Sequence, residues 1–172
     1  DHDVARLAYF ALYALQHRGQ ESAGIAAADR GGYIITQRAL GLVNQVFKEH
    51  DLRALAGDLA IGHVRYSTTG SNEWENSQPV HRSAGSRGER ELALAHNGNL
   101  INAVSLHRRL TEEGVKFRST SDSEVMAALI ATTPADSLED AIAEVLPELE
   151  GAFATVVMTR ARPCGFRHPA AL

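Results

Sequence analysis

The chain has 172 residues, of which 44% are hydrophobic and 22% charged, so it is long enough to form one domain with a substantial core. Seventeen basic and 21 acidic residues give a net charge of −4, which argues against a nucleic-acid or anionic-membrane partner. No apolar stretch is long enough to span a bilayer, no signal peptide opens the chain, and the single cysteine, Cys164, suits a reducing compartment. We therefore expect one cytoplasmic domain over residues 1–172.

The chain is predicted to begin with a helix and a β-hairpin. Apolar residues at helical spacing predict a helix over residues 3–17 with Asp3 as its N-cap. Because aromatic residues occupy its other side as well, we expect this helix to be buried on two faces. Residues 23–29 and 33–38 flank a Gly-Gly pair, which predicts a hairpin.

The middle of the chain is predicted to contain two more strands followed by a helix. Residues 59–68 and 91–96 have the composition of strands. The second of them is expected to end at His96 and to lead directly into a helix over residues 100–113, which Gly114 closes.

The last third is predicted to contain two helices and a strand. Ser121 and Glu124 form one capping-box pattern, and Ser137 and Asp140 form another, so each pair is expected to begin a helix. Residues 152–159 predict a buried strand, whereas the tail after them fits no element. This order of elements favours antiparallel sheets with helices segregated outside them.

Polar segments interrupt these elements at four places, residues 16–24, 62–70, 96–99 and 119–124. Each lies where a helix or strand begins or ends, and backbone donors are free at such points. Taken singly, each has a structural explanation, such as a helix end, a turn or a first-turn carboxylate. Only their joint occurrence indicates a site.

Together the four segments contain a chemically coherent set of groups. A guanidinium such as that of Arg65 binds a carboxylate, and a carboxylate such as that of Asp122 binds an ammonium. The Asn97 amide beside the Gly98 N–H can form an oxyanion hole. Carboxylate, ammonium and a reactive carbonyl together describe glutamine and its side-chain amide. The set contains no nucleophile.

The segments "LQHRGQESAGIA", "IGHVRYSTTG", "AHNGNLIN" and "SDSEV" resemble, in this order and spacing, the glutaminase domain of amidophosphoribosyltransferases. These are class II glutamine amidotransferases of the N-terminal-nucleophile hydrolase family, and the resemblance covers nearly the whole chain. It implies an α+β fold, a four-layer αββα sandwich of two antiparallel sheets flanked by helices, truncated at both ends. It also implies release of ammonia from glutamine for synthesis of 5-phosphoribosylamine from phosphoribosyl pyrophosphate in purine biosynthesis.

The resemblance implies substrate-binding roles for four residues. Arg65 would bind the α-carboxylate of L-glutamine, with Thr68 and the Tyr66 backbone nearby, and Asp122 would hold the α-ammonium. The implied partner is the phosphoribosyltransferase domain of the full-length chain, which is expected to form a homo-oligomer. No cofactor is expected in this domain, because Mg²⁺ would belong to the phosphoribosyltransferase domain.

The resemblance implies catalytic roles for Asn97 and Gly98 as the oxyanion hole and for Arg18 as support of the catalytic corner. The family's nucleophile is an N-terminal cysteine whose own amino group serves as the base. This chain begins with Asp1 instead, so we expect this fragment alone to be inactive. Cys164 lies far from the motifs and is interpreted as a small apolar residue.

Two alternatives stay open. The chain could be the glutaminase domain of another class II amidotransferase, or a non-catalytic glutamine-binding module, since binding residues are present without the nucleophile. The eight histidines show no spacing typical of a metal site, so no metal is expected.

Overall fold

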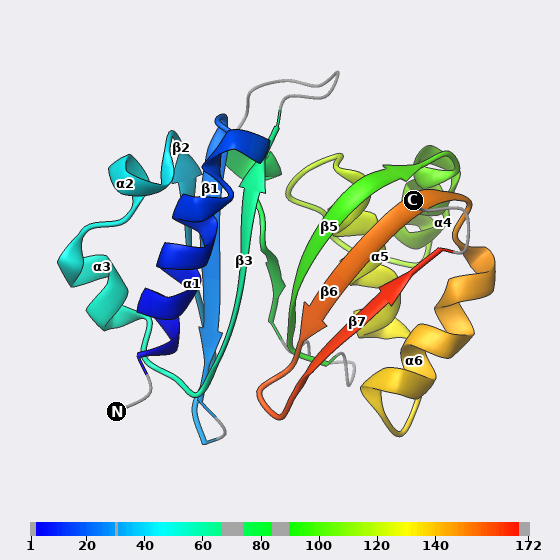
Figure 1. Cartoon of the computed structure of the whole chain (residues 1–172). Helices are drawn as coiled ribbons and strands as arrows, with labels where there is room; N and C mark the ends of the chain where they lie inside the picture. Colours follow the sequence, from blue (N-terminus) through cyan, green and yellow to red (C-terminus); the bar gives the residue numbers. More distant parts are fainter. Residues whose placement is uncertain (1–2, 30, 67–73, 84–89, 169–172) are drawn as a thin grey trace.

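The computed structural model describes residues 3–29, 31–66, 74–83 and 90–168. Two antiparallel sheets pack face to face, and helices cover both outer faces (Figure 1). The first sheet contains, from edge to edge, β2 (Ile34–Leu40), β1 (Ser22–Ala28) and β3 (Leu59–Arg65). The second sheet contains β4 (Val80–Arg82), β5 (Leu92–Leu100), β6 (Gly151–Met158) and β7 (Pro163–Arg167). The four-layer αββα prediction is therefore confirmed.

The helices divide between the two outer layers. The first sheet is covered by α1 (Val4–Ala14), the short 3₁₀ helix η1 (Gln16–Arg18), α2 (Val43–Val46) and α3 (Glu49–Ala54). The second sheet is covered by α4 (Ala103–Glu112), α5 (Asp122–Thr132) and α6 (Leu138–Val145). Two 3₁₀ turns, η2 (Trp74–Asn76) and η3 (Leu146–Glu148), lie in connections. Within the described part of the chain, no helix combines the length and apolarity that a membrane span requires.

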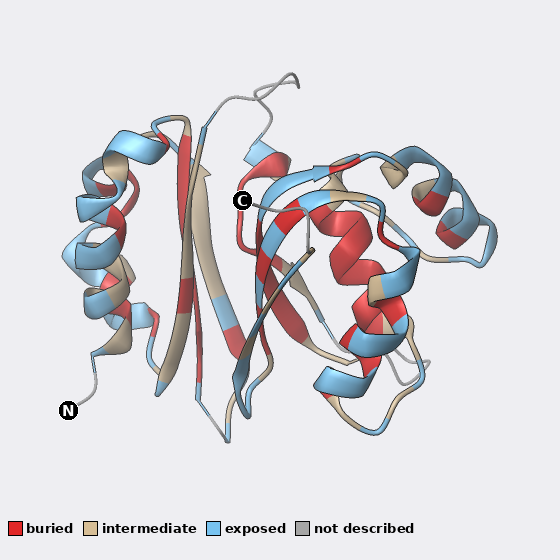
Figure 2. Ribbon diagram, turned by 45° about the vertical axis from the view of Figure 1, so that its right-hand side comes forward, coloured by how far each residue is buried: buried red, intermediate tan, exposed pale blue. Residues whose placement is uncertain are grey.

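Three apolar clusters hold the layers together, and β1 contributes to two of them. Because side chains alternate along a strand, Ala23, Ile25 and Ala27 face α1 whereas Ala26 and Ala28 face the second sheet. The small alanines let the two sheets approach closely. The third cluster lies between the second sheet and α5, which is buried on nearly all sides (Figure 2).

The predicted hairpin and the three predicted helix caps are confirmed. β1 and β2 pair in antiparallel register from Ser22↔Leu40 to Ala28↔Ile34. The side chains of Asp3, Ser121 and Ser137 each accept a hydrogen bond from the backbone N–H three residues further on, at 3.0, 3.3 and 3.0 Å. These caps satisfy N–H groups that a helix leaves unpaired at its start.

The prediction that a strand ends at His96 is wrong. β5 continues to Leu100 and stays paired with β6 through this region. Gly98 has φ = +135°, and a Cβ at this position would collide with the Ala152 carbonyl oxygen on β6. Glycine therefore keeps the Asn-Gly pair inside the strand, since it tolerates both the dihedral angle and the close neighbour. α4 begins only at Ala103.

The prediction that the first helix is buried on two faces is also wrong. Ala5 and Leu12 are buried against the first sheet, whereas Leu7, Phe10 and Tyr13 are 68%, 59% and 54% exposed. The reason is the layer order. α1 is an outer layer, so only the face toward the sheet is buried.

The tail, which fitted no predicted element, forms β7 over Pro163–Arg167 and pairs with β6. A turn closed by the Thr159 N–H, which donates to the Arg162 carbonyl at 3.0 Å, reverses the chain. Pro163, Gly165 and Arg167 are the exposed residues of this strand, and they hid its pattern, because β7 is an edge strand that buries little.

Candidate functional site

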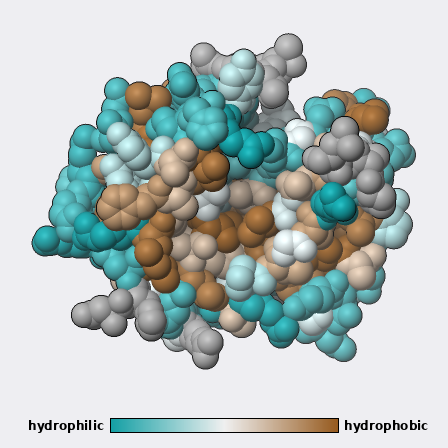
Figure 3. All heavy atoms as spheres, in the orientation of Figure 1, coloured by the Kyte–Doolittle hydropathy of each residue, from teal (hydrophilic) through white to brown (hydrophobic). Residues whose placement is uncertain are grey.

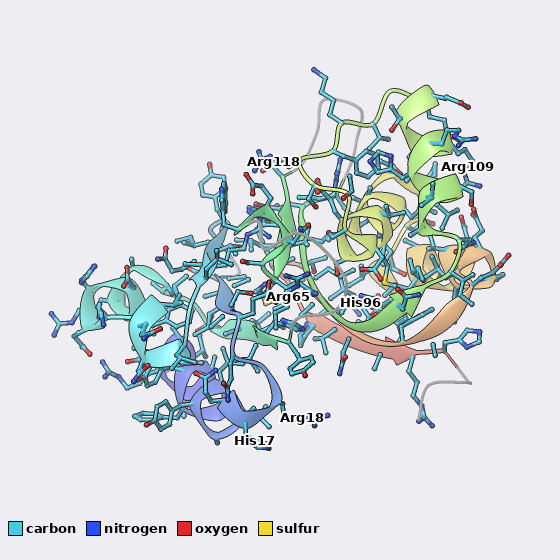
Figure 4. All side chains as sticks on the ribbon, turned by 90° about the horizontal axis from the view of Figure 1, so that it is seen from above. His17, Arg18, Arg65, His96, Arg109 and Arg118 are labelled. Atoms are coloured by element: carbon cyan, nitrogen blue, oxygen red, sulfur yellow. The ribbon has the colours of Figure 1, made fainter. Side chains whose placement is uncertain are left out.

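A cavity of about 830 Å³ opens at the end of the sandwich where β3 ends, bounded by η1, β5 and the start of α5. It brings together six of the seven residues that the sequence singled out, namely Arg18, Arg65, Tyr66, Asn97, Gly98 and Asp122. The seventh, Thr68, lies outside the described residues. Figure 4 looks onto this end of the molecule, with Arg65 and His96 near its centre.

Strand alternation explains why these side chains meet. Ile61 of β3 faces the second sheet, so Arg65, four residues further on, faces it as well. Ala95 of β5 faces the first sheet, so Asn97 does too. Arg65 and Asn97 therefore enter the cavity from opposite sheets.

The Arg65 guanidinium is held by an ion pair. Its Nη1 donates to Glu21 Oε1 at 2.5 Å, and the two side chains are only 14% and 11% exposed. The Glu21 N–H also donates to the Arg65 carbonyl at 3.0 Å. Glu21 was not singled out from the sequence, and the only signal for it was its place within the segment "HRGQES". The pair fixes a cationic group at the cavity wall.

Asp122 is the first residue of α5, where the helix dipole favours a negative charge. Its Oδ2 accepts from the Leu100 N–H at 3.2 Å, and its Oδ1 accepts from the Ser123 N–H at 2.8 Å. The carboxylate is 21% exposed and lines the cavity. It therefore presents an anchored negative charge to any bound cation.

The Asn97–Gly98 pair presents two donors at the cavity. The Asn97 side chain is exposed and makes no hydrogen bond to any residue that the structure describes. The Leu100 N–H points away from β6 and reaches Asp122. Because N–H directions alternate along a strand, the Gly98 N–H points to this same edge.

Two histidines next to the cavity, the buried His96 and the half-buried His63, were not predicted as functional residues. Burial, and then the neighbouring His96, lower the pKa of His63 to about 4. Burial also lowers the pKa of His96, although Asp122 opposes this shift. His96 Nδ1 lies 3.3 Å from Ser123 Oγ and 3.6 Å from Asp122 Oδ1. Both imidazoles are therefore neutral at pH 7.

Arg18 reaches the cavity because η1 packs directly on β3. A Cβ at Gly19 would lie 2.6 Å from the Val64 carbonyl carbon, so only glycine allows this contact. Arg18 itself is exposed at the cavity wall (Figure 4). Cys164 lies elsewhere, on β7, and packs against the cluster between the second sheet and α5.

No grouping of three or more His, Cys, Asp or Glu side chains among the described residues could hold a metal ion. The cavity instead offers a cation, a carboxylate and a donor pair, which suit an amino acid with a carbonyl in its side chain.

The chain belongs to the family of glutamine amidotransferase domains. The family described as "Glutamine amidotransferase domain" matches residues 63–166, which include Arg65, Asn97, Gly98 and Asp122.

Within this family, the similar proteins are amidophosphoribosyltransferases. The chain is 50% identical over 163 residues to amidophosphoribosyltransferase of Mycobacterium tuberculosis, covering 91% of this chain and 30% of that protein. It is 43% identical over 157 residues to the Bacillus subtilis enzyme of the same name, covering 91% and 32%. The structure of glutamine phosphoribosylpyrophosphate amidotransferase from B. subtilis, complexed with ADP and GMP, matches with a TM-score of 0.86 and 39% identity over 98% of this chain and 35% of that one. The chain thus spans about a third of the length of these relatives.

Proposed function

We propose that this chain is the glutaminase part of a cytoplasmic amidophosphoribosyltransferase. It would release ammonia from glutamine, and a phosphoribosyltransferase domain of the same protein would use that ammonia to make 5-phosphoribosylamine. The observation that carries the proposal is the single cavity that joins Arg65, Asp122 and the Asn97–Gly98 pair. The similarity to amidophosphoribosyltransferases supports phosphoribosyl pyrophosphate as the acceptor of the ammonia, over the acceptors of other class II amidotransferases.

In this proposal the two charged groups bind the amino-acid end of glutamine. Arg65, held by Glu21, binds the α-carboxylate, and the neighbouring Tyr66 and Thr68 assist. Asp122, held at the start of α5, binds the α-ammonium. Charge-assisted hydrogen bonds of this kind orient the ligand as well as hold it. The side-chain amide is then directed toward β5.

The Asn97 amide and the Gly98 N–H are proposed to stabilise the oxyanion. A cysteine thiolate attacks the side-chain carbonyl carbon of glutamine, and the negative charge that forms on the oxygen lies between these two donors. The α-amino group of this cysteine takes the thiol proton and passes it to the leaving nitrogen, so ammonia departs and a thioester remains. Water then hydrolyses the thioester to glutamate and restores the thiol. Arg18 supports this corner of the cavity.

A groove of about 490 Å³ is the proposed place for the strand that carries this cysteine. The groove lies between β3 and the inner face of β6 and β7, and it shares His63, His96 and Asn97 with the larger cavity. Figure 3 shows apolar residues at the surface in this part of the molecule. Val156, which lines the groove, is 42% exposed. A strand that starts at the cavity and runs antiparallel to β3 would end near the beginning of α1 (Figure 1).

The proposal is tested by Asn97→Ala in the full-length protein with its N-terminal cysteine. Loss of one oxyanion donor should lower the glutamine-dependent kcat by about 10²–10³-fold. The KM for glutamine should change much less, because the donor fits the transition state better than the substrate. Ammonia-dependent synthesis, which bypasses this site, should be unchanged.

Asn44→Ala is the matched control, since Asn44 is an exposed asparagine on α2, outside the first sheet. An equal loss of both activities in Asn97→Ala would show that Asn97 is only structural. Glutamine binding without any glutaminase activity in the unsubstituted full-length protein would favour the alternative of a binding module.

A further inference from the structure

Gln78 occupies the gap between the two sheets next to the cavity. It follows η2, and the residue is 7% exposed. Its carbonyl oxygen lies against Gly24 of β1, where a Cβ would collide with it. Arg38 of β2 donates to the carbonyl of the preceding residue, Ser77. The backbone of this segment is therefore anchored on the first sheet.

The side chain of Gln78 reaches the second sheet. Its Nε2 donates to the His96 carbonyl at 3.1 Å, and its Oε1 accepts from the His96 N–H at 2.6 Å. Two residues in an antiparallel ladder exchange the same pair of hydrogen bonds. β4 pairs with β5 only as far as Val80↔Leu94, so the Gln78 amide extends this ladder by one further step.

The next donor along this edge of β5 is the Gly98 N–H. The N–H groups of His96, Gly98 and Leu100 point to one edge because directions alternate along the strand. Gln78 holds the first of them and Asp122 holds the third. Gly98 lies between these anchors, and its φ of +135° is one of many backbone angles that glycine can adopt. Pairing with β6 keeps the segment extended, and the two anchors fix the opposite edge, which carries the Gly98 N–H.

We propose that Gln78 is a positioning residue of the glutaminase site, which holds His96 so that the Gly98 N–H and the Asn97 amide are aimed at the reacting oxygen of glutamine. This inference rests on the proposed function. Oxyanion donors act only within about 2.7–3.1 Å of the position that the oxygen takes in the transition state, so a small shift of β5 lowers the rate. Binding of the substrate depends mainly on Arg65 and Asp122 and is little affected.

The test is Gln78→Met in the full-length protein, because methionine has a similar volume and makes neither hydrogen bond to His96. The glutamine-dependent kcat should fall about tenfold, less than on loss of a donor itself, while the KM for glutamine changes less than about twofold. Ammonia-dependent synthesis should be unchanged. Gln45→Met is the matched control, since the Gln45 side chain also accepts from a backbone group, the Leu42 N–H, but lies on the exposed side of α2.

A double substitution separates positioning from a general structural role. In the Asn97→Ala background, Gln78→Met should lower kcat by clearly less than it does alone, because part of the hole that it positions is already missing. The inference would be overturned if the effects of the two substitutions on kcat were fully additive. It would also be overturned if Gln78→Met lowered ammonia-dependent synthesis as much as it lowers glutamine-dependent synthesis. If Gln78→Met does not fold, Gln78→Glu carries the same expectation, since it keeps the acceptor for the His96 N–H and loses the donor.

The outcomes also distinguish this inference from the proposed function. If Asn97→Ala lowers kcat and Gln78→Met does not, only the role of Gln78 is refuted. If Asn97→Ala itself has no effect on kcat, the oxyanion hole is refuted, and the role of Gln78 is refuted with it.

Discussion

Lowering the pH from 7 to 5 should destabilise the fold through His63. This imidazole faces the second sheet from β3, with His96 and Arg65 as its charged or titratable neighbours, and Asp122 lies beyond His96. Burial lowers its pKa in the folded state to about 4 from the ordinary value of 6.5. Between these two pH values the unfolded chain binds a proton that the folded chain does not, so stability falls as the pH falls.

The magnitude follows from the two pKa values. The full loss, reached at and below pH 4, is about 3 kcal/mol, and about 2 kcal/mol of it has already occurred at pH 5. Above pH 6.5 the contribution is complete and the stability no longer depends on this group. His96, whose pKa is lowered by burial as well, acts in the same direction.

Urea unfolding of the chain at pH 7, 6 and 5, followed by fluorescence of its single tryptophan, measures how the free energy of unfolding changes with pH. His63→Gln should reduce the loss of unfolding free energy between pH 7 and 5 by about 2 kcal/mol, whatever it does to stability at pH 7. His50→Gln is the control, because the His50 side chain is 82% exposed. An unchanged slope in His63→Gln would refute the assignment of a neutral imidazole at His63.

Two more substitutions test the site. Gly98→Ala should destabilise the fold by about 3 kcal/mol or more, because it combines a positive φ with a collision against β6. Gly165→Ala, whose Cβ would meet nothing closer than 4.0 Å, should be nearly neutral in the same unfolding assay, and equal effects would contradict the argument. Asp122→Asn in the full-length protein should raise the KM for glutamine about 10- to 100-fold, since one charge-assisted contact is lost, without changing ammonia-dependent synthesis. An unchanged KM would remove Asp122 from the binding site.

Much of the candidate site could be predicted because its residues lie at the ends of elements. Arg65 ends β3, and Asp122 begins α5 directly after a capping serine. Polar residues are conspicuous at such positions in an otherwise apolar pattern. Their chemistry, a cation, an anion and a donor pair, then indicated one kind of ligand before any contact was known.

Other residues of the site could not be predicted, because what they do depends on partners distant in the chain. Glu21 holds Arg65 from 44 residues away, and the Gln78 side chain bonds to His96 across 18 residues. His63 is an ordinary strand residue by pattern, and its pKa is lowered first by burial in the fold and then by His96 of the second sheet. No local periodicity contains this information.

The sequence by itself determined where the capped helices α1, α5 and α6 begin, the hairpin of the first sheet and the set of groups that meet in the cavity, because capping residues, turn glycines and side-chain chemistry act over a few neighbouring positions. The tertiary structure alone decided which faces are buried and how far β5 runs. By local pattern Asn97 and Gly98 form a turn. In the fold they remain in the strand, because β6, more than fifty residues later in the chain, supplies the backbone partners that keep this segment extended.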